Sequence, residues 1–114
     1  MTPDSVIAAL DRKIAETGET VFVRRYTGTT SAYVEVECLA MVRGYNPHEV
    51  VAGSYVVNGD RKVIISPASL DNGTWPFPPK VNDKVVVGGK VHNVQYPDII
   101  KMADKAVRIE MQVR

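Results

Sequence analysis

Cysteine, leucine, long apolar runs and an excess of either charge are all scarce in this 114-residue chain. The single cysteine, Cys38, permits no internal disulfide, which is typical of proteins that work in a reducing compartment. No apolar run approaches the roughly 20 residues of a membrane-spanning helix, so we expect no membrane partner. Residues 1–5 lack a basic stretch followed by an apolar core, so we expect no secretory signal either. These absences predict a small soluble protein made in the cytoplasm.

The charge balance narrows the possible partners. Fourteen basic and thirteen acidic residues leave a formal net charge of +1. Proteins held to nucleic acid mainly by phosphate charge usually carry a clear basic excess, so this balance argues against such a partner. The hydrophobic share of 45% and the charged share of 24% are those of an ordinary globular chain, and the length suits a single domain, 1–114.

Among the aliphatic residues, the β-branched Val and Ile far outnumber Leu. The chain has three Leu but nineteen Val and seven Ile. Branching at Cβ stiffens a side chain and suits it to the surface of a sheet, whereas leucine is the usual filler of helix faces. Most of the chain is therefore expected to be β-structure.

Residues 3–17 are the exception and predict an N-terminal helix. Thr2 can cap it, Pro3 fits its first turn, and Gly18 stands where a left-handed stop is expected. One apolar stripe follows the helical period; it consists of Val6, Ile7, Leu10 and Ile14. This stripe fits two arrangements equally, packing on a sheet of the same chain or docking on a neighbouring subunit or adaptor.

Beyond Gly18 the apolar period changes to two, which predicts strands. The expected strands are 19–27, 32–43, 61–66, 84–87, 90–95 and 106–113, with a short helical turn at 67–70. The Gly88-Gly89 pair suits a two-residue hairpin turn. The proline-rich crossing 75–79 either caps one end of the sheet or offers a groove for an extended peptide, and the first is favoured. The fold class expected for 19–114 is a small antiparallel β-barrel or sandwich of five or six strands.

No pattern in the chain indicates catalysis. Cys38, His48 and His92 are far apart and lack the spacing of metal ligands, and Cys38 falls on the apolar face of an alternating strand. Gly88-Gly89-Lys90 lacks the remaining positions of a phosphate-binding loop. We therefore expect no enzyme, no metal site and no cofactor.

The unusual segment is 44–60, which is too long for a passive connection between two strands. It carries four Val and two Tyr but only two acids and no Lys or Arg. A segment this apolar requires a surface on which to bury itself. Composition leaves two possibilities open, a further strand on its own barrel or contact with another chain.

Two runs around this segment resemble head–tail connector proteins of tailed bacteriophages. They are 42–51 (VRGYNPHEVV) and 58–66 (NGDRKVIIS). The later block 79–94 and the last strand, ending at 108–114 (RIEMQVR), share the resemblance, which covers about residues 19–114. The chain is most similar to the head-closure or stopper proteins, which also occur in prophages and gene transfer agents.

The resemblance implies a structural virion protein at the neck, made in the host cytoplasm. In that family a homo-oligomeric ring of six or twelve copies joins a portal-bound adaptor to the tail terminator or tail tube. The ring retains the packaged genome, and double-stranded DNA passes through it without sequence-specific binding. The resemblance assigns channel closure or tail docking to the segment 44–60, with candidate residues Tyr45, Asn46, Pro47, His48, Glu49, Val50, Val51, Tyr55, Val56 and Val57.

Two alternatives belong to other classes. One is a different neck or tail component, such as a tail terminator or a minor tail protein. The other is a small barrel that binds nucleic acid, which should interleave aromatic and basic residues on one sheet face. Only residues 22–26 (FVRRY) approach that pattern.

Overall fold

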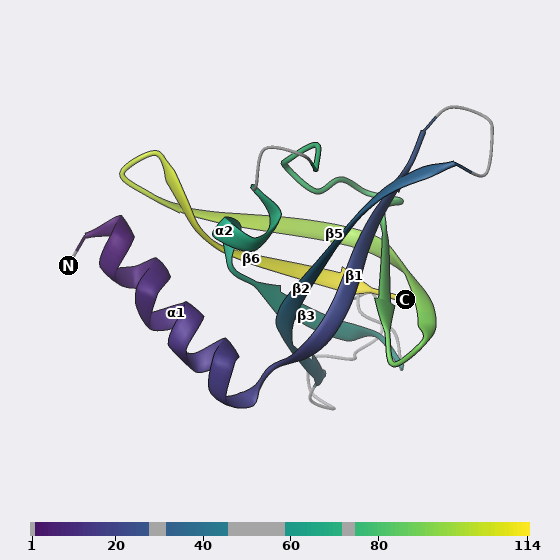
Figure 1. The fold of residues 1–114 in the computed structure, drawn as a ribbon, viewed down its shortest axis with the longest axis horizontal. Helices are drawn as coiled ribbons and strands as arrows, with labels where there is room; N and C mark the ends of the chain where they lie inside the picture. Colours follow the sequence, from purple (N-terminus) through teal and green to yellow (C-terminus); the bar gives the residue numbers. More distant parts are fainter. Residues whose placement is uncertain (1, 28–31, 46–58, 72–74) are drawn as a thin grey trace, which may run out of the picture.

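A computed structural model of the chain describes residues 2–27, 32–45, 59–71 and 75–114. Within these residues, six antiparallel strands close into a barrel that carries an N-terminal helix (Figure 1). The elements are α1 (Pro3–Thr17), β1 (Glu19–Tyr26), β2 (Tyr33–Gly44), β3 (Arg61–Ile65), α2 (Pro67–Leu70), β4 (Lys84–Val87), β5 (Lys90–Met102) and β6 (Lys105–Val113). The expectation of a mainly β barrel with an N-terminal helix is confirmed.

The strands follow the order β1-β2-β3-β6-β5-β4 around the barrel, and β4 pairs with β1 to close it. The long strands β2 and β5 each change partner along their length, β2 from β1 to β3 and β5 from β4 to β6. Beyond the barrel, β5 and β6 continue together as an arm toward the N-terminal end of α1 (Figure 1). Each strand of the barrel body therefore has a hydrogen-bonded neighbour on both sides.

The barrel interior is filled by the residues that alternate along the strands, as the period of two predicted. On β2 the buried members are Val36, Cys38 and Ala40, and the whole apolar face of β6 is buried. The interior cluster comprises Val21, Val23, Val36, Cys38, Ala40, Val63, Ile65, Leu70, Trp75, Val85, Val94, Ile109, Met111 and Val113. Valine and isoleucine dominate this cluster, in agreement with the β-structure that the composition predicted.

One end of the barrel is closed by the proline-rich crossing. Trp75 is buried in the interior cluster and Phe77 packs against it, so the capping interpretation holds. Arg25 fixes the crossing: its guanidinium donates to Asp83 at 3.0 and 2.8 Å and to the carbonyls of Pro76 and Pro78 at 2.7 Å each. The Asp83 carboxylate, which is almost fully buried, also accepts a hydrogen bond from the backbone of Lys80 at 2.8 Å.

Helix α1 lies against the outside of the same barrel. Leu10 and Ile14 are buried there against Ile64 of β3, with Met41 of β2 packed beside them. Thr2 and a serine three residues later form a capping box at its start. Of the two arrangements open from sequence, the structure places this half of the stripe on the chain's own sheet.

Gly18 ends the helix for a reason different from the one expected. Its backbone is extended (φ −85°, ψ 170°), so the expectation of a left-handed stop was wrong. What requires glycine is a close approach: an added Cβ would lie 2.5 Å from the carbonyl oxygen of Ile14 and 2.9 Å from that of Ala40. The position is crowded because the chain turns directly from α1 into β1 against β2.

We expect Gly18→Ala to lower the free energy of unfolding by about 2 kcal/mol, because the two carbonyl oxygens belong to backbone that cannot move cheaply. Gly44→Ala is the matched control, since a Cβ there meets nothing within 4 Å. Urea denaturation of both variants measures the difference. Equal stability of the two variants would show that the junction can relax.

Strand β5 is longer than expected from sequence. The prediction ended it at residue 95, but it continues to Met102 with a bulge between Val94 and Tyr96. The additional length includes Pro97, although proline is uncommon inside sheets. Beyond Asn93, however, β4 no longer pairs with β5, so Pro97 lies where β5 is paired only with β6 and proline is tolerated.

Candidate functional site

The segment 44–60 connects two neighbouring strands of the barrel. It leaves at the end of β2 and returns at Asp60, directly before β3. Tyr45, Gly59 and Asp60 are described by the structure. The other candidate residues, Asn46, Pro47, His48, Glu49, Val50, Val51, Tyr55, Val56 and Val57, lie outside the described residues. The site is therefore built from the barrel surface on which the two ends of the segment stand.

The returning end of the segment is fixed by a buried carboxylate. The Asp60 side chain is 0% exposed. Its oxygens accept hydrogen bonds from Nε2 of Gln112 at 2.9 Å and from Nε and Nη2 of Arg114 at 2.9 and 3.1 Å. The hydrogen bond and the charge of Asp60 raise the pKa of Arg114, although desolvation opposes them. A carboxylate paired in this way ties the base of the segment to β6 as well as to β3.

The departing end of the segment carries an aromatic ring between two cations. Tyr45 is half-buried, and the charged groups of Arg43 and Lys62 lie 5.9 and 5.5 Å from its ring centre. Such distances are within the range of cation–π attraction. Arg43 and Lys62 are opposite each other on β2 and β3, so this cluster spans the two strands that the segment joins.

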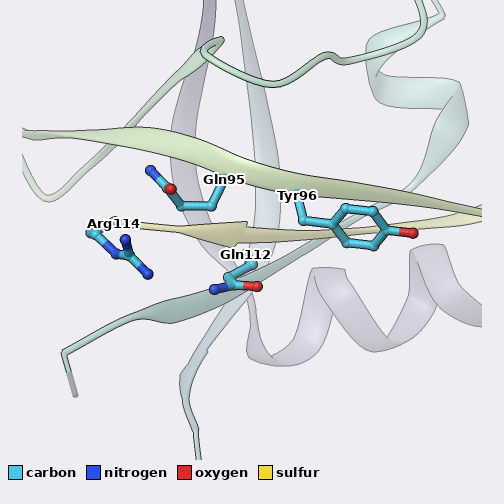
Figure 2. A pocket seen from close by; sticks show the side chains of 4 residues that line it. All are labelled: Gln95, Tyr96, Gln112 and Arg114. Atoms are coloured by element: carbon cyan, nitrogen blue, oxygen red, sulfur yellow. The ribbon is translucent and has the colours of Figure 1, made fainter. Parts of the chain in front are cut away.

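A hollow of about 610 Å³ lies beside the fixed end, on the outer face of β5 and β6. Its described lining consists of Gln95, Tyr96, Gln112 and Arg114 (Figure 2). Tyr96 is 59% exposed, a high value for a large aromatic side chain. Amides and a guanidinium can hydrogen-bond, and the phenol of Tyr96 can hydrogen-bond as well as stack. The arrangement suits contact with another molecule.

A smaller hollow of about 170 Å³ continues this surface toward Tyr45. It is lined by Tyr45, Lys62, Tyr96, Asp98, Glu110 and Gln112. Glu110 accepts a hydrogen bond from Arg108 at 2.6 Å and lies 3.5 Å from the ammonium of Lys62. Desolvation acts to raise the pKa of Glu110, but its hydrogen bonds and the charges of Arg108 and Lys62 outweigh it and lower that pKa. Glu110 is thus held as a carboxylate between two cations.

The candidate docking residues of α1 divide into two pairs. Leu10 and Ile14 are covered by the barrel, whereas Val6 and Ile7 are only half-buried. Val6 lines a hollow of about 320 Å³ on one side of the helix, and Ile7 lines one of about 290 Å³ on the other. The part of the stripe that the barrel does not cover therefore lies at the N-terminal turns of α1.

The basic run that suggested nucleic-acid binding is largely used within the chain. Arg24 pairs with Glu35 and lies 4.5 Å above the ring of Tyr33. Arg25 is bound by Asp83, as described above. These two guanidiniums are therefore engaged by carboxylates, which weakens the case for a phosphate-binding face on β1.

Sequence reasoning placed Cys38 correctly in the core, where burial and, to a lesser degree, Glu37 raise the pKa of its thiol to about 12. It missed the roles of Tyr96, Gln112 and Arg114 at the site. The alternation of the last strand could have indicated Gln112, because it places this residue on the face opposite Met111 and Val113. Nothing in the sequence alone joins that residue to Asp60, because 52 positions separate them.

Comparisons with known proteins add no relative to this description. No protein-family model matches the chain, and no curated protein matches it. Among the described residues, no group of three His, Cys, Asp or Glu side chains could hold a metal ion. No helix in the described part of the chain is long and apolar enough to cross a membrane.

Proposed function

We propose that this protein is a head-closure, or stopper, protein in the neck of a tailed bacteriophage or a phage-like particle. The observation that carries the proposal is the order of elements around the 44–60 segment. A helix, a hairpin, the long low-charge segment, a GDRKVII strand, a proline crossing, a second hairpin and a last strand follow one another, as the resemblance to the stopper family requires. The closed barrel is compatible with this order.

In the proposed role, six or twelve copies form a ring between a portal-bound adaptor and the tail terminator or tail tube. Packaged double-stranded DNA is retained by the ring and passes through it without sequence-specific binding. The barrel serves as the body of each subunit, and the 44–60 segment makes the contacts that close the channel or receive the tail. Two features support this division: the segment is rich in Val and Tyr, and its returning end is tied to β6 through Asp60. Repetition in a ring multiplies weak contacts into a large total.

Another neck or tail component, such as a tail terminator, would use a similar ring. Negative-stain images of the purified protein mixed with adaptor rings or with tail tubes separate the two roles. A stopper should bind the adaptor side, whereas a terminator should bind tail tubes alone.

Replacing residues 46–58 by Gly-Asn should leave the barrel folded and abolish function. The change retains Tyr45 and Asp60, so both described ends of the segment stay in place. Long surface connections contribute little to core stability, so the melting temperature should change by only a few degrees. Complementation of particles that lack the gene should then give heads that lose DNA or lack tails.

A second variant separates chain length from side-chain contact. It replaces the same thirteen residues by a Gly/Ser segment of equal length. The proposal expects this variant to fail as well, because the contacts depend on the Val and Tyr side chains. Filled, tailed and infectious particles from a folded variant of either kind would overturn the proposed role of the segment.

A further inference from the structure

Three basic residues, Arg61, Lys90 and His92, occupy strand positions at the end of the barrel where the 44–60 segment leaves and returns. Arg61 lies two positions before Val63 on β3, and Val63 is part of the interior cluster. His92 and Lys90 on β5 lie opposite Val85 and Val87 of β4, which face the interior. Residues that are paired across two strands, and residues two apart on one strand, lie on the same face of a sheet. All three basic residues therefore belong to the inner face of the barrel at this end.

His92 is the most confined of the three. It is 8% exposed, whereas Arg61 and Lys90 are exposed. Among the described residues, no side chain or backbone group makes a hydrogen bond with its ring. Burial first, and then the charges of Lys90 and Arg61, lower the pKa of His92. Both cations therefore act electrostatically on the imidazole, and no described carboxylate forms an ion pair with it.

Two acids of the described part of the chain, Glu19 and Asp60, share this end of the barrel. Glu19 begins β1 on the same inward register as Val21, and it is exposed. Asp60 precedes Arg61, but its carboxylate is bound by Gln112 and Arg114. The remaining inward positions at this level, on β2, β4 and β6, are glycine or valine. Among the described residues, the balance of charge at this end is therefore basic, although the whole chain carries a net charge of only +1.

We propose that Arg61, Lys90 and His92 form a phosphate-binding site at this end of the barrel. A guanidinium, an ammonium and an imidazole supply donors of different reach around one anion, and two of them are permanently charged. A phosphate group presents its acceptor oxygens in several directions, so it suits donors from two strands better than a planar carboxylate does. The phosphate site stands on this geometry alone; its assignment to the DNA backbone is the part that rests on the proposed stopper function.

The first test follows the pKa of His92 by NMR in sodium phosphate and in sodium chloride of equal ionic strength. A bound phosphate favours the imidazolium, so phosphate should raise the pKa of His92 above its value in chloride. The chain has two histidines, and a His92→Gln sample assigns the signals. In the double variant Arg61→Gln/Lys90→Gln, the difference between the two salts should disappear.

A matched control removes the same charge elsewhere. Lys13→Gln/Lys101→Gln alters two exposed lysines, one on α1 and one on the far part of β5, and should keep the full difference between phosphate and chloride. Equal pKa values of His92 in the two salts, or an equal loss in both double variants, would overturn the site.

The second test identifies the source of the phosphate. Binding of a fluorescent 20-base-pair duplex is measured as a function of salt for the same two double variants. Loss of this one phosphate contact should reduce the slope of log K against log salt by about one for Arg61→Gln/Lys90→Gln and leave the control unchanged. A pKa response to inorganic phosphate without this change in slope keeps the site and overturns its assignment to DNA. Neither result depends on ring assembly or tail attachment, so failure here is distinguishable from failure of the proposed function.

Discussion

Cys38→Asp is expected to be largely unfolded at neutral pH, with the free energy of unfolding lowered by about 4 kcal/mol. Cys38 lies in the barrel interior between valine and isoleucine side chains and is 8% exposed. A carboxylate there has either to lose its hydration or to take up a proton. Burial already raises the pKa of the Cys38 thiol to about 12, which shows how strongly this position disfavours a negative charge. Urea denaturation at pH 7 measures the loss.

The sign of its pH dependence gives a second readout. The interior raises the pKa of the new carboxyl above its unfolded value, so the native state binds more protons than the unfolded state between those two pKa values. The variant should therefore lose stability as the pH rises through this window and regain it at acid pH. Leu39→Asp is the control, because the neighbouring side chain is 44% exposed on the outer face and should tolerate a carboxylate at any pH. Equal losses for the two variants would place Cys38 outside the core.

Removal of the carboxylate by Asp83→Ala is expected to lower the free energy of unfolding by about 3 kcal/mol. Asp83 accepts two hydrogen bonds from Arg25 and one from the backbone of Lys80. Without it, the half-buried guanidinium keeps the two proline carbonyls and its position 4.8 Å from the centre of the Trp75 ring, but loses its counter-charge. The crossing that holds Trp75 over the barrel end loses one of its attachments, the hydrogen bond from the Lys80 backbone to Asp83, so near-ultraviolet circular dichroism should weaken together with stability.

Two further variants test whether the Arg25–Asp83 pair fixes the proline-rich crossing. Glu35→Gln breaks the more exposed pair with Arg24 and should shift the denaturation midpoint little. The double variant Arg25→Met/Asp83→Ala should be more stable than Asp83→Ala alone, because no charge is then left without its partner. If the double variant is the less stable of the two, the Arg25–Asp83 pair is not what fixes the crossing.

The parts of the fold that follow from local patterns could be predicted. Alternation along β2 and β6, the capped stripe of α1 and the Gly88-Gly89 turn each depend on neighbouring residues, and each is observed. Both turn glycines adopt positive φ, at 58° and 81°. Local reasoning failed where packing decides: Gly18 is needed for a close approach, and β5 continues through Pro97 because β6 supports it.

The candidate site could be predicted only in part for the same reason. Length and composition indicated the 44–60 segment, but its anchor depends on the pairing of β3 with β6. Asp60 and Arg114 are 54 positions apart, and no short motif joins them. The convergence of Arg61 with His92 likewise appears only when the registers of three strands are known.

Closure of the sheet has a mechanical consequence. Gly44, at the end of β2, is hydrogen-bonded opposite Arg61, at the start of β3, and Arg61 is opposite Val113 on β6. A force on the 44–60 segment therefore acts on β2 and β3. It is transmitted to β6 through the β3–β6 hydrogen bonds and through the contacts of Asp60. No strand of the barrel body can be peeled from a free edge, because each has a partner on both sides. Tension on the segment would thus have to shear several ladders together, and the barrel should yield as a unit rather than unravel strand by strand.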